Sequence, residues 1–122
     1  RNDLLDRKAG VVPQISDFTL LDAPAGFAYV YWFGDNASSY TWSDGSPTAG
    51  VTNTTTGVWA YGTPQIGSGF QVNAPADTTT RTFKLFVGAY GARGQFVAYL
   101  SDSSAPGYTN SSLFNPTSGS GG

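Results

Sequence analysis

Few side chains in this 122-residue sequence could perform acid–base or nucleophilic chemistry. Its eight acidic residues are all aspartates, and it has no histidine, cysteine or glutamate. Unperturbed aspartate and lysine titrate far from neutral pH, so catalysis would need an aspartate pair or a serine–lysine dyad. The two lysines, Lys8 and Lys84, stand in no recognisable catalytic setting. We therefore predict that the chain is not an enzyme.

The aspartates bear on metal binding instead. Asp35, Asp44, Asp77 and Asp102 fall in turn-like segments, and loop carboxylates are ligands that calcium prefers. The sequence has no run with the spacing of a calcium-binding loop, and aspartates in turns commonly hydrogen-bond their own backbone. Transition metals find no soft ligand. We expect no cofactor and no metal, with a single structural calcium ion as the alternative.

Composition and charge indicate which kinds of molecule the protein could bind and where it is located. Only 11% of the residues are charged, the net charge is −2, and six scattered cations form no basic stripe for nucleic acid. The longest apolar run, Phe27–Phe33, is too short to cross a bilayer. Abundant Ser, Thr, Asn and Gly, together with the absence of cysteine, suit a secreted protein. We predict an extracellular or cell-surface location, no nucleic-acid partner and no membrane insertion.

Three segments match the pattern for asparagine-linked glycosylation. They are Asn36–Ser38, Asn53–Thr55 and Asn110–Ser112. Such matches also arise by chance in a chain this rich in Asn, Ser and Thr. Both interpretations stay open at this point.

Hydrophobic periodicity predicts an all-β fold. Apolar and polar residues alternate with a period of two between Gly, Pro, Asn and Asp, and no stretch has helical spacing. This pattern is typical of an antiparallel β-sandwich, jelly-roll or immunoglobulin-like, with about seven or eight strands. The expected strands are Gln14–Leu21, Phe27–Phe33, Ser39–Ser43, Gly57–Gly62, Gly69–Asn73, Arg81–Tyr90 and Gly94–Asp102, with a short one near Ser111–Phe114.

One pair of strands is expected to form a hairpin. Arg81–Tyr90 would pair with Gly94–Asp102 through the glycine-containing connection Gly91–Gly94. Alternating apolar residues of the two strands would then share one face and form the core. These are Phe83, Leu85, Val87, Ala89, Phe96, Ala98 and Leu100.

The whole chain is expected to be one sandwich domain over residues 1–117, followed by a flexible Gly/Ser-rich tail at 118–122. It begins at Arg1 rather than methionine, so we expect either a removed leader or a longer parent protein.

The segment Pro75–Asp102 resembles a β-sandwich module that recurs in secreted and surface bacterial multidomain proteins. Arg7–Gly10 and Tyr40–Gly45 support the resemblance, which covers most of the chain. Members of the family often lie beside polysaccharide-acting or adhesive domains, and no catalytic residue comes with the resemblance. The family pattern has a further strand before Arg7 and another after the Gly/Ser-rich stretch. We therefore expect strands outside this chain to complete the sandwich.

Aromatic residues supply the candidate binding site. In a strand, Phe27–Phe33 would be apolar on both faces, which a sheet with one solvated face does not require. The candidate ligand- or partner-binding residues are Tyr29, Tyr31, Trp32, Phe33, Trp59 and Tyr61. Large aromatics also fill cores, and for Trp42 and Trp59 core packing is the slightly favoured interpretation.

Two functions follow from these observations. The first is a non-catalytic carbohydrate-binding module whose partner is a polysaccharide. The alternative is a structural subunit of an extracellular filament or surface assembly, held to identical neighbouring subunits by strand complementation.

Overall fold

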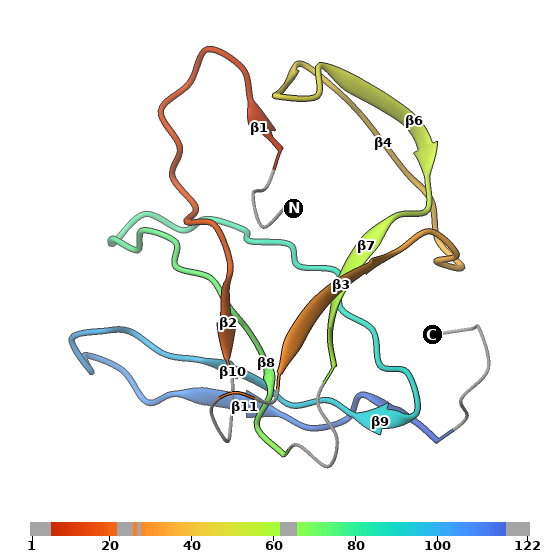
Figure 1. Ribbon diagram of the computed structural model, residues 1–122. Coiled ribbons are helices and arrows are strands. Elements are labelled where there is room, and N and C mark those ends of the chain that lie inside the picture. Colours follow the sequence, from red (N-terminus) through yellow and green to blue (C-terminus); the bar gives the residue numbers. More distant parts are fainter. Residues whose placement is uncertain (1–5, 22–25, 27, 62–65, 117–122) are drawn as a thin grey trace. The chain divides into compact units, whose positions relative to one another are not determined.

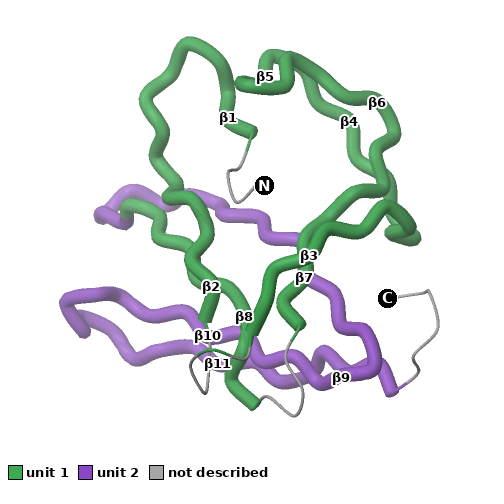
Figure 2. The backbone as a smooth tube through the Cα atoms, in the orientation of Figure 1, with its two compact units in different colours: residues 1–75 green, residues 76–122 purple. Residues whose placement is uncertain are grey.

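The computed structural model describes residues 6–21, 26, 28–61 and 66–116 (Figure 1). Clustering of contacts divides the chain into two compact units, residues 1–75 and 76–122 (Figure 2). The described residues form strands and turns and no helix, and every strand pair is antiparallel. The prediction of an all-β chain is therefore confirmed. The expected tail at 118–122 lies outside the described residues.

The described part of the first unit contains eight short strands. They are β1 (Arg7–Lys8), β2 (Thr19–Leu21), β3 (Tyr29–Phe33), β4 (Tyr40–Ser43), β5 (Gly45–Ser46), β6 (Gly50–Thr54), β7 (Gly57–Tyr61) and β8 (Gly69–Gln71). Three of their pairings are nested along the chain: β2–β8 encloses β3–β7, which encloses β4–β6 (Figure 1). β1 pairs with β5, in the connection between β4 and β6.

The second unit has four described strands. They are β9 (Ala92–Arg93), β10 (Phe96–Ala98), β11 (Tyr108–Asn110) and β12 (Phe114–Asn115). β9–β12 encloses β10–β11, and the Gly94 amide donates to the Leu113 carbonyl between the two pairs at 2.9 Å. These four strands therefore form one interrupted hairpin.

The expected hairpin of Arg81–Tyr90 with Gly94–Asp102 is wrong. Residues 81–90 belong to none of the strands, and the residues from β9 to β10 pair with β11 and β12 instead. Alternation indicates an extended chain but does not identify its partner, which depends on backbone hydrogen bonds to a distant segment. The expected tight turn at Gly91–Gly94 does not form either, because Ala92 and Arg93 make up β9, which pairs with β12.

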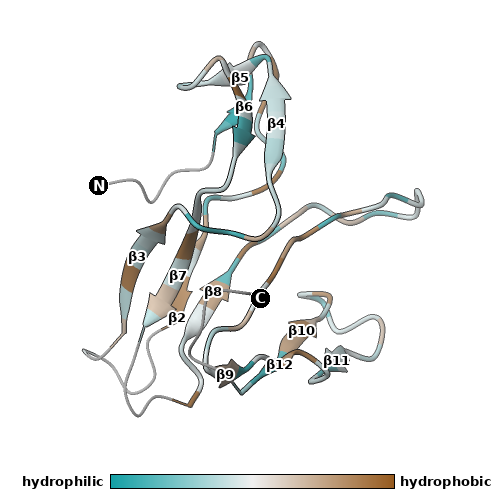
Figure 3. Ribbon diagram, turned by 90° about the vertical axis from the view of Figure 1, so that its right-hand side faces the viewer, coloured by the Kyte–Doolittle hydropathy of each residue, from teal (hydrophilic) through white to brown (hydrophobic). Residues whose placement is uncertain are grey.

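Most other expected strands are present but shorter. The structure keeps only Thr19–Leu21 of Gln14–Leu21 and Gly69–Gln71 of Gly69–Asn73, while Phe27 and Gly62 lie outside the described residues. Twelve strands are described rather than seven or eight, and they form six two-stranded sheets. β6 was not expected because its residues are mostly polar, as the teal colour in Figure 3 shows.

The expected core is also wrong. Of its seven residues, Ala89 is half-buried and the other six, Phe83 and Leu85 among them, are exposed. Among the described residues only Ala28 is buried, with 7% of its surface accessible. The expected inner face belongs to a hairpin that does not form, so Phe83, Leu85 and Val87 lie outside the described strands.

Polar contacts fasten the first strand of the first unit. The Arg7 guanidinium donates to the Ile15 carbonyl and forms an ion pair with Asp17 at 2.7 Å, and Lys8 forms an ion pair with Asp44. Asp44 adopts a left-handed conformation with φ of 58°, and its carbonyl accepts a hydrogen bond from the Ala9 amide. The Lys8–Asp44 ion pair therefore holds β1 beside β5 in addition to their short ladder, while Arg7 ties β1 to residues 15–17.

The pairing of β3 with β7 runs through five consecutive residue pairs, from Tyr29–Tyr61 to Phe33–Gly57. At its end the Phe33 ring covers Gly57: a Cβ added there would lie 2.5 Å from Cζ of Phe33. An aromatic side chain opposite a glycine shields the glycine backbone and fixes the register of the two strands.

We predict that Gly57→Ala lowers the free energy of unfolding by about 1–3 kcal/mol, because the new methyl group overlaps the Phe33 ring and forces it aside. Gly69→Ala is the matched control, since an added Cβ there has no atom within 4 Å. Urea unfolding monitored by tryptophan fluorescence measures both. Equal destabilisation by the two substitutions would contradict this packing.

Candidate functional site

Five aromatic side chains share one face of the β3–β7 ribbon. Because successive side chains of a strand alternate between faces, the register places them together. We call this surface the aromatic face; it consists of Tyr29, Tyr31, Phe33, Trp59 and Tyr61. These are five of the six candidate residues that the sequence analysis named.

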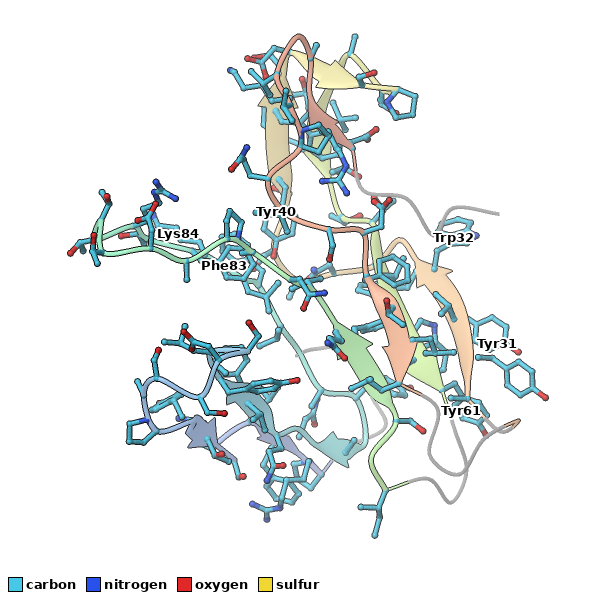
Figure 4. All side chains as sticks on the ribbon, turned by 90° about the vertical axis from the view of Figure 1, so that its left-hand side faces the viewer. Tyr31, Trp32, Tyr40, Tyr61, Phe83 and Lys84 are labelled. Carbon is cyan, nitrogen blue, oxygen red and sulfur yellow. The ribbon has the colours of Figure 1, made fainter. Side chains whose placement is uncertain are left out.

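Trp59 is the centre of the aromatic face. Its ring centroid lies 5.7 Å from that of Tyr31, across the ladder, with the planes at 39°, and 5.5 Å from that of Tyr61, at 68°. Both separations fall in the range of favourable aromatic pairs. The rings of Tyr31 and Tyr61 therefore lie next to the Trp59 indole and are inclined to its plane. Figure 4 shows Tyr31 and Tyr61 on neighbouring strands.

The aromatic face is accessible in the structure. Tyr29, Tyr31, Trp59 and Tyr61 expose between 36% and 55% of their surfaces. No charged residue occurs in β3 or β7, so the surface combines apolar rings with the hydroxyl groups of its tyrosines. Such a surface can stack against an apolar group and exchange hydrogen bonds at its margins.

The structure separates Trp32 from the other five candidates. Trp32 lies opposite Val58 and shares its face of the ribbon with Val30 and Ala60. It is the most exposed of the six candidates, at 75%. In Figure 4 its side chain leaves β3 in a different direction from that of Tyr31. Both faces of the ribbon are therefore apolar, but only one carries a cluster of rings.

The connection beyond Phe33 holds this end of the aromatic face. The Thr55 hydroxyl donates to the Gly34 carbonyl at 2.6 Å, and the Asn36 amide donates to the Thr55 carbonyl at 3.1 Å. These bonds join the residues that follow β3 to those that precede β7. They tie the two segments together just beyond the last residue pair of the ladder, Phe33–Gly57. The role of Gly57 as the residue that the Phe33 ring covers was not predicted from the sequence. A glycine at the start of the apolar run of β7 was a usable signal for it.

Trp42 does not join the aromatic face. Its indole packs against Gly45, where an added Cβ would lie 3.1 Å from Nε1, and this buried nitrogen has no hydrogen-bond partner. Its half-buried position agrees with the packing role favoured for it from sequence. For Trp59 the structure shows a half-open ring within the aromatic face rather than an enclosed one.

A shallow cleft of about 600 Å³ lies elsewhere in the first unit. It is lined by Arg7 and by residues 13–17 and 73–75. Its one cation, Arg7, is already bound to the Ile15 carbonyl and the Asp17 carboxylate. Little charge is left for a ligand, and the aromatic face is the stronger candidate.

The described residues contain no group of three or more acidic side chains that could hold a metal ion. Three of the loop aspartates are bound within the protein: Asp44 to Lys8, Asp77 to Arg81 and to the Thr79 amide, and Asp102 to the Ser104 amide. These are the ion pairs and turn contacts that compete with calcium for a carboxylate.

Three comparisons with known proteins give no relative. No family model matches the chain, and no curated protein or solved structure shows significant similarity. The resemblance to a bacterial β-sandwich module therefore stays a prediction. Among the residues that the structure describes, no helix has the length and apolar character needed to span a bilayer.

The turn after β10 provides a test of the loop geometry. The Ser104 backbone amide, and then its hydroxyl, hold the pKa of Asp102 below its ordinary value because both bonds favour the ionised carboxylate. A lowered folded-state pKa stabilises the fold above the unfolded pKa, and this contribution is lost as the pH falls through the folded value.

We predict that an NMR titration of Asp102 gives a midpoint below that of an unfolded aspartate. Ser104→Ala should raise the midpoint only part of the way, since the amide donor remains. Ser101→Ala is the control and should leave the midpoint unchanged. A midpoint at the unfolded value in the wild-type protein would contradict the turn geometry.

Proposed function

We propose that this protein is a non-catalytic, extracellular β-sandwich module that binds polysaccharide through the aromatic face. The observation that carries the proposal is the open cluster of Tyr31, Trp59 and Tyr61 on neighbouring strands. A pyranose ring has an apolar C–H face that packs on the flat side of an indole. The flanking tyrosines would contact the same ring from either side and bind its hydroxyl groups.

The charge of the site favours a neutral glycan. β3 and β7 contribute no acidic or basic residue, so nothing on the aromatic face would pair with a uronate or sulfate group. An uncharged polysaccharide with equatorial hydroxyl groups presents the broadest C–H face. In this proposal, strands outside the chain complete the sandwich at its ends, as the family resemblance implies.

We predict that Trp59→Ala or Tyr31→Ala weakens polysaccharide binding by roughly tenfold or more, a loss of about 1.4 kcal/mol, because each removes a stacking surface. Affinity electrophoresis in gels that contain neutral β-glucan, xylan or galactomannan measures the retardation. Unfolding in urea, measured in parallel, should show that the Tyr31→Ala fold keeps most of its stability.

Trp32→Ala is the matched control, because it removes a large exposed ring from the opposite face of the same ribbon. Its retardation should equal that of the wild-type protein. Equal losses for Trp32→Ala and Trp59→Ala would contradict the assignment to the aromatic face. Absence of retardation in every gel would contradict binding of a neutral glycan.

A second function, as a structural subunit of an extracellular filament or surface assembly, is favoured by a separate observation. Ala28 is the only buried residue among those described, and 21 large hydrophobic side chains are exposed. So much accessible apolar surface is typical of an interface between subunits. In this function, strands of identical neighbours would complete the sheets by β-augmentation.

We predict that light scattering combined with intact mass spectrometry separates these functions. A subunit would form particles many times heavier than the 12.8 kDa chain, and Tyr31→Ala would reduce them to monomers. A binding module would give the same small mass before and after that substitution. Unfolding of the Tyr31→Ala variant by several kcal/mol would contradict both, since the ring would then belong to a core.

A further inference from the structure

The extended segment Arg81–Tyr90 is the largest apolar feature of the second unit outside its strands. Phe83, Leu85 and Val87 alternate along it and expose between 47% and 59% of their surfaces. None of its residues belongs to a described strand, although β-branched and aromatic side chains favour this conformation. Figure 4 labels Phe83 and Lys84 on the segment. An extended chain of this composition is a template for pairing with another strand.

We propose that residues 82–88 pair antiparallel with the same residues of a second copy of the chain, about a twofold axis at Leu85. The inference is independent of polysaccharide binding, because it uses no residue of the aromatic face. Residues 82–88 are the proposed interaction surface, and the partner that binds to it is a second copy of the same chain.

The apolar side chains of residues 82–88 are self-complementary in this register. In antiparallel strands, directly opposite residues point to the same face of the sheet. With the axis at Leu85, Leu85 meets Leu85 of the second copy, and Phe83 meets Val87 in both directions. Phe83, Leu85 and Val87 of each copy then meet only apolar side chains, which supplies the cross-strand contacts that stabilise a sheet.

The charge pattern of residues 82–88 favours the same register. Lys84 is the only charged residue between 82 and 88. An axis at Leu85 places it opposite Phe86 of the second copy, so no like charges face each other across the ladder. An axis at Lys84 would place two ammonium groups opposite each other, which destabilises a ladder. A register shifted by a single residue would turn Lys84 of one copy toward the apolar face of the other.

Two features of the second unit exclude an axis at Phe86. That register would place Phe83 opposite Ala89, a small side chain. The Ala89 carbonyl also accepts a hydrogen bond of 3.1 Å from the Asn115 side chain within its own unit. The register centred on Leu85 ends at Gly88 and leaves this bond intact.

The absence of cysteine from the sequence makes the register directly measurable. In the proposed pair, the two Cβ atoms at position 85 lie about 4.5–5.5 Å apart. Leu85→Cys, treated with a methanethiosulfonate crosslinker that has a one-carbon spacer, should give several-fold more covalent dimer than Phe86→Cys or Tyr99→Cys. Tyr99 is exposed and lies outside the segment. Equal yields at the three positions, or a higher yield at position 86, would overturn the proposal.

A charge-exchange experiment tests the same contact without covalent chemistry. Leu85→Lys and Leu85→Asp should each weaken dimerisation roughly tenfold or more, because like charges would then face each other across the axis. An equimolar mixture of the two variants should recover the dimer, since opposite charges then meet. Tyr99→Lys should dimerise as the wild type does.

Analytical ultracentrifugation over a range of concentrations measures each of these equilibria. A mixture that remains monomeric would overturn the proposal, as would a wild-type chain that shows no self-association. The outcome is distinguishable from that of the glycan experiment, because Leu85→Lys should leave retardation by polysaccharide unchanged, while Trp59→Ala should leave the dimer unchanged.

Discussion

The register of β3 against β7 is the constraint on which the candidate site depends. Five consecutive pairs bring the tyrosines of β3 opposite Trp59 and Tyr61, and the Phe33 ring over Gly57 fixes the end of that alignment. A slip of one residue would turn every side chain of one strand to the other face and place Trp32 and Val30 beside Trp59. The aromatic face therefore exists because of a backbone alignment, not because aromatic residues are numerous.

The same ribbon explains why a site can form in a chain with so little catalytic chemistry. Stacking and hydroxyl contacts require geometry rather than a titrating group, and β3 and β7 supply geometry without charge. The aspartates are used in ion pairs and turns, such as Asp44 with Lys8 and Asp102 with the Ser104 amide. The charged side chains of the described loops form contacts within the protein, while the aromatic rings of β3 and β7 remain accessible.

A structural feature can be predicted from the sequence when it depends on residues that are close together in the chain, and not when it depends on pairing between distant segments. The apolar composition of Phe27–Phe33 and Gly57–Gly62 is a local signal, and it indicates both strands. The alternation of side chains along a strand places Trp32 on the opposite face of β3 from Tyr31, and this separation follows from the order of the residues alone. The choice of pairing partner is not local: Arg81–Tyr90 has a strand-like pattern, yet the described hairpin joins β9 and β10 to β11 and β12. β6 pairs with β4 although Val51, opposite Trp42, is its one large apolar residue.

The nested order of the first unit also determines how costly each pairing is for a disordered chain. The innermost pair, β4 with β6, closes a connection of only a few residues, whereas β2 and β8 are separated by most of the unit. Loop-closure entropy rises with the length of free chain between the partners. Once β4 and β6 are joined, the free chain between β3 and β7 is shorter, and their joining in turn shortens the chain between β2 and β8. If the strands pair in the order β4–β6, β3–β7 and β2–β8, each step closes only a short free segment, although β2 and β8 are far apart in the sequence.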